Sequence, residues 1–150
     1  MTSKRIYVID DHAVVRWGYR ALLEREGDLT IVGEAASGEE ALAQVPALEL
    51  DLVIADVSLG RGIDGIETVE RLKRERPELP ALVISLHSEA RLIERALRVG
   101  AQGYVVKDEA PRTLVQAVRH VLGGGVYLSD ALRDRLNGDR LNGDGLSNAA

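Results

Sequence analysis

The stretch IYVIDDH, residues 6–12, sets a short and continuously apolar run directly before two aspartates. Strands that are buried on both faces of a sheet have this pattern. Similar runs follow along the chain, and segments with apolar residues three and four apart separate them. This alternation predicts an α/β fold with a doubly wound parallel sheet, in which each strand is followed by a helix. The predicted strands are residues 6–9, 30–34, 52–55, 82–86 and 103–106.

Several residues mark the ends of the predicted helices. Ser37 and Ser88 each stand just before a helical segment, where a hydroxyl can accept a hydrogen bond from a free backbone N–H. Gly100 follows the fourth helical segment, and Pro111 suits the first turn of the fifth. These markers support five strand–helix units in succession.

Length and composition narrow the class of protein. The chain has 150 residues, a formal charge of −5 and no cysteine. This length is typical of one domain, and the acidic balance argues against a module whose main work is to neutralise nucleic-acid phosphates. The lack of cysteine excludes disulfide scaffolds and thiolate metal sites. No apolar run is long enough to span a membrane and no signal segment is recognisable, so a cytoplasmic protein without membrane contact is expected.

Polar side chains follow the predicted strands at the edge where open parallel sheets bind ligands. The first strand ends in Asp10 and Asp11, the third in Asp56, the fourth in Ser85 and the fifth in Lys107. Three carboxylates in one crevice repel one another unless a cation shares the site, and Mg²⁺ prefers such oxygen ligands. If the third strand lies beside the first, one carboxylate can attack a phosphoryl group. The lysine would then neutralise phosphoryl charge, and the serine hydroxyl would donate a hydrogen bond.

A family resemblance extends over residues 4–122 and rests on five motifs in order at strand ends. They are VIDDH at 8–12, DLVIADVSL at 51–59, DG at 64–65, VISLH at 83–87 and GAQGYVVKD at 100–108. With these motifs the chain resembles the receiver domain of two-component response regulators, the CheY-like family. The resemblance implies a flavodoxin-like fold with five parallel strands in the order 2-1-3-4-5.

The segments VVRWGYRALLE at residues 14–24 and VYLS at 126–129 point to a subfamily. They are most similar to the NarL/FixJ (LuxR-type) response regulators. Members of that subfamily usually carry a C-terminal helix-turn-helix domain that binds DNA, and no such domain is recognisable in this chain.

The resemblance implies a role for each acidic residue of the site. Asp56 is the phosphoacceptor and also a metal ligand. Asp11 is a direct ligand, Asp10 is a ligand mainly through water, and the backbone carbonyl of Ser58 completes the metal shell. The implied metal is Mg²⁺, or Mn²⁺ in its place.

The same resemblance assigns the residues that respond to phosphorylation. Ser85 is the switch hydroxyl, Lys107 binds the phosphoryl group, and Tyr104 is the switch aromatic residue. The side chains of Ser58 and His87 border the phosphoryl group and are expected to modulate its hydrolysis.

The implied function is that of a response regulator in two-component signal transduction. A sensor histidine kinase or a phosphotransfer protein phosphorylates Asp56, and the fourth helix, fifth strand and last helix form a surface that then contacts a partner. The domain is not a turnover enzyme, because its implied chemistry is limited to self-catalysed phosphotransfer and autodephosphorylation. In the full regulator the output is expected to be control of transcription, with DNA contacted only through an output domain.

Other interpretations stay open. The chain can act as a stand-alone receiver through protein contact, or as an interaction module that is indifferent to phosphorylation, although an idle site has no physical reason to keep repelling carboxylates together. A phosphatase with an aspartate nucleophile is disfavoured, because Asp10-Asp11-His12 lacks the DxD spacing of such enzymes. A homodimer through the first and last predicted helices is not separated from a monomer by the pattern.

Histidine pairs do not indicate a metal site in this sequence. His12, His87 and His120 are far apart along the chain, so no two of them have the i, i+4 spacing that places ligands on one helix face. A metal or phosphohistidine role for them is therefore set aside.

One loop departs from the family pattern. Gly60 stands where the family often has a proline, and the interval from Asp56 to Asp64 is one residue longer than usual. Because glycine widens the range of backbone conformations, the loop LGRGID at residues 59–64 is expected to be more mobile than a proline-fixed one.

The strand and helix pattern decays from Leu128 onward. Residues 1–124 are predicted to form the receiver domain, and residues 125–150 a short helix over 129–136 followed by a flexible linker or tail, with a helix-turn-helix output domain absent. The segment DRLNG occurs at 134–138 and again at 139–143, and we interpret this as a local duplication without function.

Overall fold

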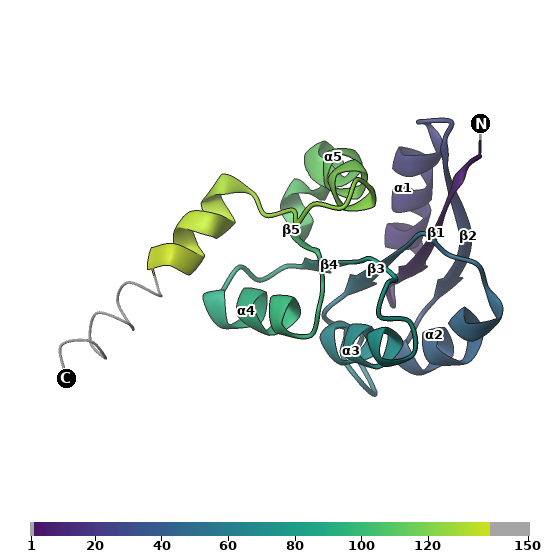
Figure 1. The fold of residues 1–150 in the computed structure, drawn as a ribbon, viewed down its shortest axis with the longest axis horizontal. Helices are drawn as coiled ribbons and strands as arrows, with labels where there is room; N and C mark the ends of the chain where they lie inside the picture. The colour runs from purple at the N-terminus through teal and green to yellow at the C-terminus, as the bar shows by residue number, and fades with distance from the viewer. Residues whose placement is uncertain (1, 139–150) are drawn as a thin grey trace.

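Strands and helices alternate along residues 2–138, the part of the chain that the computed structural model describes (Figure 1). Short 3₁₀ turns at Val45–Ala47 and Lys107–Glu109 supplement them. Within this part, no helix combines the length and apolar character that a membrane crossing requires. The elements are β1 (Lys4–Ile9), α1 (Ala13–Glu24), β2 (Leu29–Ala35), α2 (Gly38–Gln44), β3 (Leu52–Asp56), α3 (Gly65–Glu75), β4 (Ala81–Ser85), α4 (Ala90–Arg98), β5 (Gly103–Val106) and α5 (Ala110–Leu122).

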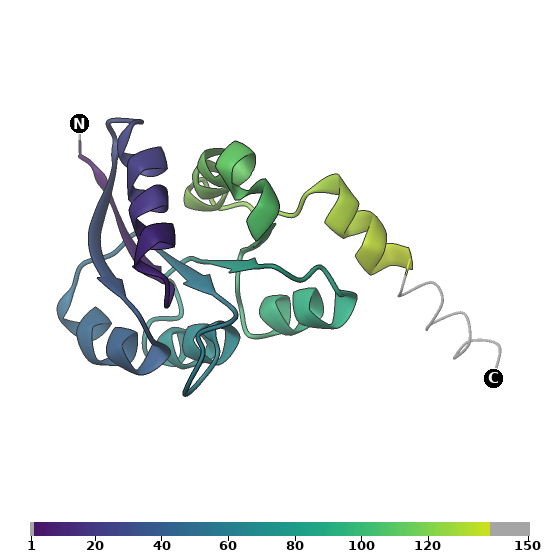
Figure 2. The ribbon, with the colours of Figure 1, turned by 180° about the vertical axis from the view of Figure 1, so that it is seen from behind.

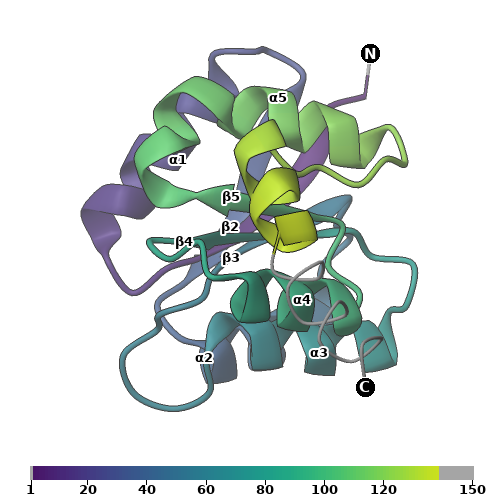
Figure 3. The same ribbon diagram turned by 90° about the vertical axis from the view of Figure 1, so that its left-hand side faces the viewer.

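The strands form one parallel sheet in the order β2-β1-β3-β4-β5, which confirms the predicted fold. Helices α1 and α5 cover one face of the sheet, and α2, α3 and α4 cover the other (Figure 3). The chain runs from β1 outward to β2 and then crosses to β3 on the opposite side of β1. The direction of winding therefore reverses between β1 and β3, and such folds bind ligands outside the carboxyl ends of the strands at this point.

Each strand of the sheet centre contributes to two hydrophobic cores. In β1, Ile6 and Val8 pack with the core beneath α1 and α5, whereas Tyr7 and Ile9 pack with the core beneath the other three helices. Every residue of β3 and β4 is buried. Strands enclosed on both faces gain apolar contacts from every side chain, and this explains the continuous apolar runs in the sequence.

The end of β4 differs from the sequence prediction by one residue. The predicted strand includes Leu86, but the structure ends β4 at Ser85 and leaves the Leu86 side chain 61% exposed. Ser85 Oγ accepts a hydrogen bond of 3.0 Å from His87 N, which turns the chain away from the sheet. The side-chain bond thus ends a strand that hydrophobicity alone would extend.

The helix-end predictions hold at three positions and fail at one. Ser37 caps α2 by accepting a hydrogen bond from Glu40 N, Gly100 ends α4 at a φ of 103°, and Pro111 lies in the first turn of α5. The cap predicted at Ser88 is wrong, because α4 begins one residue later with Glu89 at its N-cap and no side-chain cap bond.

The chain after α5 returns to the sheet. Tyr127 N donates to Gln102 O at 2.8 Å and Tyr127 O accepts from Tyr104 N at 3.1 Å, so this residue lies alongside β5. Residues 130–138 are helical, and Figure 2 shows this helix beyond α4 and α5. Its Leu132 and Leu136 are buried in the same core as α4. The sequence predicts that the tail begins after residue 136, but residues 137 and 138 still belong to the helix, and the rest of that tail, with the second DRLNG, lies outside the described residues.

Candidate functional site

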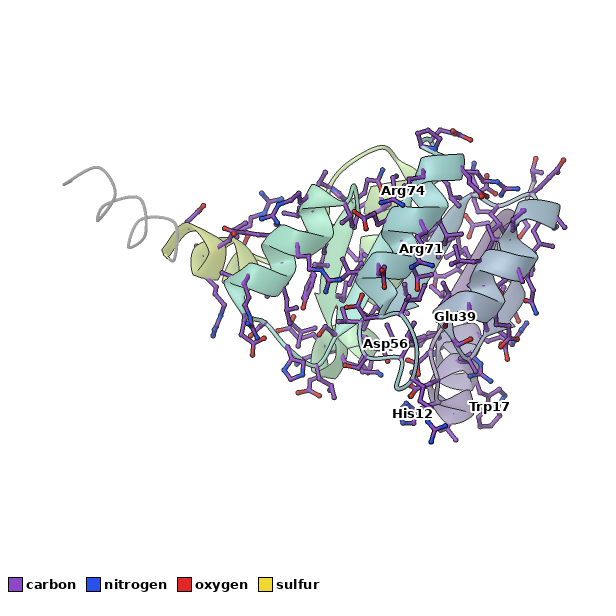
Figure 4. The ribbon with its side chains drawn as sticks, turned by 90° about the horizontal axis from the view of Figure 1, so that it is seen from below. His12, Trp17, Glu39, Asp56, Arg71 and Arg74 are labelled. Carbon is purple, nitrogen blue, oxygen red and sulfur yellow. The ribbon has the colours of Figure 1, made fainter. Side chains whose placement is uncertain are left out.

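Four side chains with metal-binding atoms gather at the carboxyl edge of the sheet. Asp10, Asp11 and His12 follow β1, and Asp56 ends the adjacent strand β3. One ligand atom of each lies within 4.8 Å of the others. His12 and Asp56 are labelled in Figure 4 at this edge. The structure therefore brings together the three aspartates that the sequence predicts as a cluster.

Asp10 is fully buried and has one oxygen without a hydrogen bond. Its Oδ1 accepts from His12 N at 2.8 Å. Its Oδ2 lies 3.2 Å from Lys107 Nζ but accepts no hydrogen bond from the described residues. A buried carboxylate oxygen whose only nearby cation is a lysine shared with a second carboxylate remains costly, and a further cation among the carboxylate oxygens reduces that cost. The donor set fits a hard divalent ion with oxygen ligands.

Lys107 is shared by two of the carboxylates. Its Nζ donates to Asp56 Oδ2 at 2.9 Å and lies within ion-pair distance of Asp10. Burial alone would lower the pKa of Lys107, but the hydrogen bond and charge of Asp56, together with Asp10, outweigh it and raise that pKa. The lysine is therefore a permanent cation here, and one positive charge faces three carboxylates.

Burial raises the pKa of Asp56, and the negative charge of Asp10 adds to that shift. The hydrogen bonds from Lys107 and from Ser58 N oppose it. The Ser58 N–H reaches Asp56 Oδ1 at 3.3 Å, so both oxygens of the Asp56 carboxylate are held. These two hydrogen bonds fix the orientation of the buried Asp56 carboxylate.

Ser85 and Tyr104 lie on the neighbouring strands β4 and β5 and are both buried. Ser85 Oγ uses its acceptor capacity on His87 N and keeps its O–H as a donor. Tyr104 Oη donates to His87 O at 2.7 Å. Burial raises the pKa of Tyr104, and the nearby Ser85 hydroxyl opposes this shift. The serine and the tyrosine thus meet at the turn between β4 and α4.

His12 belongs to the cluster, although its spacing from the other histidines does not predict a metal site. Its Nδ1 lies 2.9 Å from Asp11 Oδ1, and its side chain is 67% exposed. The i, i+4 criterion missed it because its neighbours come from strand ends and not from one helix face. The signal that points to it is adjacency to the aspartate pair.

The loop between β3 and α3 has a partner that the sequence analysis missed. Glu39 Oε2, at the start of α2, accepts a hydrogen bond of 3.0 Å from Ile63 N. At the far end of the loop, Asp64 caps α3 by accepting from Glu67 N, and it forms a two-pronged ion pair with Arg95 of α4 at 2.7 and 3.2 Å. These contacts join residues far apart in sequence, so no local pattern predicts them.

Comparisons with known proteins agree with this geometry. A model of the response regulator receiver domain matches residues 6–119. The transcriptional activator protein ExaE of Pseudomonas putida is 41% identical over 131 residues, which are 87% of this chain and 61% of ExaE. The nitrate/nitrite response regulator NarL of Escherichia coli K12 is 34% identical over 85% of this chain and 58% of NarL. The chain thus spans about three-fifths of the length of these curated relatives.

A solved structure with a similar fold comes from the same class of protein. The crystal structure of a LuxR-family two-component response regulator from Aurantimonas superposes with a TM-score of 0.88 at 32% identity, covering 93% of this chain and 99% of that one. The fold, the cluster at the sheet edge and the extent of the match agree with the resemblance noted in the sequence. The chain belongs to the response regulator receiver family, with NarL- and UhpA-type regulators among its relatives.

Proposed function

We propose that Asp56 accepts a phosphoryl group from a sensor histidine kinase or a phosphotransfer protein, in a reaction that needs Mg²⁺ or Mn²⁺. The observation that supports this most strongly is the shared position of Lys107, 2.9 Å from Asp56 and 3.2 Å from Asp10, within a group of carboxylates that one lysine does not neutralise. A phosphoryl group adds further negative charge, so the site has to hold a cation while it reacts.

The transfer is a displacement at phosphorus. An oxygen of the Asp56 carboxylate attacks the phosphorus of a phosphohistidine, an O–P bond forms, and the P–N bond breaks. The imidazole nitrogen leaves with the electron pair of that bond. The signal ends by hydrolysis: water attacks the phosphorus of the acyl phosphate, the bond to Asp56 breaks, and inorganic phosphate is released. The domain catalyses its own phosphorylation and dephosphorylation and turns over no other substrate.

Four groups are assigned to the metal. Asp11 and Asp56 would hold it directly, Asp10 mainly through water, and Ser58 through its backbone carbonyl. When bound, the ion neutralises charge on the phosphoryl oxygens. The state of Asp10 Oδ2 supports this assignment, because this buried oxygen has only the ion-pair contact with Lys107, which is shared with Asp56, and no hydrogen bond from the described residues.

Ser85, Lys107 and Tyr104 are assigned to the response. Lys107 and the Ser85 hydroxyl would bind phosphoryl oxygens, and a move of Ser85 would disturb the turn to which Tyr104 is bonded through His87 O. The side chains of Ser58 and His87 are both exposed beside this turn and the acceptor, where they would modulate hydrolysis. Only a difference in affinity for the phosphoryl group between two states can shift their populations.

The proposed output is control of transcription. ExaE is named a transcriptional activator, and a solved structure at 25% identity contains two RcsB dimers bound to DNA. We assign DNA contact to an output domain outside the receiver, since the receiver is acidic. We assign to the surface of α4, β5 and α5 the partner contacts that phosphorylation switches, and any homodimer to α1 and α5. A cytoplasmic location follows from a kinase partner of this type.

Acetyl phosphate and MgCl₂ test the acceptor directly. Wild-type protein is expected to show a retarded band on a Phos-tag gel and a gain of one phosphoryl mass, and EDTA should abolish both. Asp56→Asn should remove the product, whereas Asp51→Asn, at the opposite end of β3, should leave it intact. Retardation that persists in Asp56→Asn would contradict the acceptor assignment. Partner binding that ignores Asp56→Asn would favour a module indifferent to phosphorylation.

A further inference from the structure

The loop of residues 57–64 joins the acceptor strand β3 to α3 and is pinned mainly at its ends. Val57 N donates to Ile84 O at 2.9 Å and Gly65 N donates to Val57 O at 2.9 Å, so the two ends are fixed to the sheet. Between them, Gly60 and Gly62 have φ values of 70° and 85°. Such left-handed conformations are accessible to glycine at little cost, and they do not by themselves hold the loop in one place.

One hydrogen bond holds the middle of this loop. Among the hydrogen bonds of residues 2–138, the bond from Ile63 N to Glu39 Oε2 is the one that joins residues 59–63 to another element. A Cβ atom on Gly62 would lie 2.6 Å from Glu39 Oε1, so the carboxylate packs directly against the loop backbone. Glu39 therefore accepts a hydrogen bond from the loop and also limits, by steric contact, where the loop backbone can lie.

The same loop reaches the acidic cluster. A Cβ atom on Gly60 would lie 3.4 Å from Asp11 Oδ2, so the loop backbone passes beside a proposed metal ligand. Two residues farther on, the loop meets Glu39, and Figure 4 shows Glu39 and Asp56 labelled near this loop. The glycine positions thus place the backbone between an acid of the site and an acid of α2.

Glu39 is itself held by tight packing of α2 on α3. A Cβ atom on Gly38 would lie 2.7 Å from Ile63 Cγ1, so the first residue of α2 has to be small to approach the loop. The Ser37 cap bond to Glu40 N fixes the same turn. The Ile63 hydrogen bond lowers the pKa of Glu39, and Arg71 adds to this shift, so the carboxylate is charged at neutral pH.

We infer that Glu39 is a positioning residue for the phosphoacceptor site, which acts by holding the 59–63 loop beside Asp11 and Ser58. This inference rests on the proposed function, because its consequence is the placement of the Ser58 carbonyl and of the loop backbone at the metal. Loss of the contact lets the loop sample positions away from the cluster, and each such position lowers the fraction of molecules that are ready to bind the ion.

Two substitutions separate hydrogen bonding from charge. Glu39→Ala removes the acceptor for Ile63 N, whereas Glu39→Gln keeps an oxygen that can accept the same bond without the charge. Glu70→Ala is the matched control, since Glu70 is a surface glutamate of α3 whose Oε1 lies 3.9 Å from Arg74. Glu39 is exposed, so neither substitution removes a core contact.

Loop mobility is measured first, by the hydrogen exchange of the Ile63 amide, which donates this bond, in the absence of metal. We expect exchange in Glu39→Ala to be about three- to tenfold faster than in wild type, the range for loss of one hydrogen bond, and exchange in Glu39→Gln and Glu70→Ala to be close to wild type. Unchanged exchange in Glu39→Ala would overturn the inference without bearing on phosphorylation.

Metal binding is measured next, by titrating each protein with MgCl₂ and following amide chemical shifts. We expect the Kd of Glu39→Ala to rise by about three- to tenfold, and its phosphorylation by acetyl phosphate to be slowed at limiting Mg²⁺ but restored at saturating Mg²⁺. Glu39→Gln should rescue both. Faster loop exchange with an unchanged Kd would overturn the positioning role. Absence of Mg²⁺ binding in the wild type would contradict the proposed function itself.

Discussion

Two clusters of this molecule place one basic side chain between two carboxylates, one at the protein surface and one in the interior. In the surface cluster, Arg119 of α5 donates to Asp28 at 2.8 and 2.9 Å and to Glu26 at 3.0 Å. The hydrogen bonds from Arg119 lower the pKa of Asp28. The hydrogen bonds to Asp28 and Glu26 raise the pKa of Arg119. Solvent reaches every group, so each carboxylate is satisfied as an anion.

The interior cluster also places one basic side chain between two carboxylates, but its electrostatic outcome is the opposite. Lys107 lies between Asp10 and Asp56, but burial raises the pKa of Asp56 despite the lysine. Asp10 Oδ2 has no hydrogen bond from the described residues, and Asp11 adds a third carboxylate. The two clusters differ in their exposure to solvent. Water already stabilises the charge of the exposed carboxylates, whereas the buried carboxylates lack that stabilisation and can still gain from binding a further cation.

Removal of the basic residue should produce the largest difference in stability between the two clusters. Lys107→Met leaves two buried carboxylates without their cation, and we expect the free energy of unfolding to fall by about 2–4 kcal/mol in metal-free protein. Arg119→Met should cause a much smaller loss, which added salt reduces further, because exposed ion pairs are screened. Urea denaturation followed by circular dichroism measures both. Equal losses in the two variants would contradict the comparison.

Addition of Mg²⁺ should stabilise the protein through the interior cluster and not through the surface cluster. At a concentration of 100 times Kd, the ion is expected to stabilise the wild-type protein by about 2.7 kcal/mol, because it binds the folded state alone. Asp11→Asn should lose most of this gain, whereas Asp28→Asn should keep it. The measurement is the shift of the urea midpoint with and without MgCl₂, and EDTA should reverse it. A gain that persists in Asp11→Asn would exclude that residue as a ligand.

In metal-free protein, the carboxyl pKa values of the two clusters should be shifted in opposite directions. The pKa of Asp56 is raised above its ordinary value of 3.8, so its ionisation destabilises the fold above the folded pKa and this penalty disappears as the pH falls toward 3.8. The pKa of Asp28 is lowered, so its contribution to stability is present above 3.8 and is lost as the pH falls through the folded pKa. Carboxyl carbon shifts followed by NMR should give midpoints on opposite sides of 3.8. Midpoints on the same side would reject this assignment.

The smallest change in stability is expected for a substitution at Tyr19, beside the interior cluster. Tyr19 is buried on α1, and its hydroxyl has no hydrogen bond from the described residues. Burial and the charges of Asp10 and Asp56 raise the pKa of this hydroxyl. Tyr19→Phe removes an unsatisfied polar atom, so the unfolding free energy should change by less than about 1 kcal/mol, with a gain in stability the expected sign. A clear loss would indicate that the hydroxyl contributes to the site through water.

The sequence predicts the interior cluster better than its surroundings. Asp10, Asp56 and Lys107 each follow an apolar run, and the carboxyl ends of parallel strands must share one edge, so local pattern and topology together suffice to place them. Glu39 and Arg95 escape prediction because their partners, Ile63 and Asp64, are separated from them by 24 and 31 residues. Such contacts depend on how helices pack, and that is not encoded in the local hydrophobic pattern.

A side-chain hydrogen bond accounts for the error at the end of β4. Leu86 reads as strand by its apolarity, yet the Ser85 side chain captures the next free N–H and directs the chain outward. The role predicted for each site residue stays a prediction, since chemical role depends on phosphate and metal that geometry alone does not supply.

The return of Tyr127 to β5 covers part of an open edge of the sheet. β5 is the last strand of the sheet, and an unpaired edge of this kind is a template on which other chains add strands. Tyr127 occupies hydrogen-bonding groups of Gln102 and Tyr104 on that border, and Leu132 and Leu136 shield the apolar surface next to it. A chain shortened to residue 124 would bare this border, and aggregation should accompany its purification.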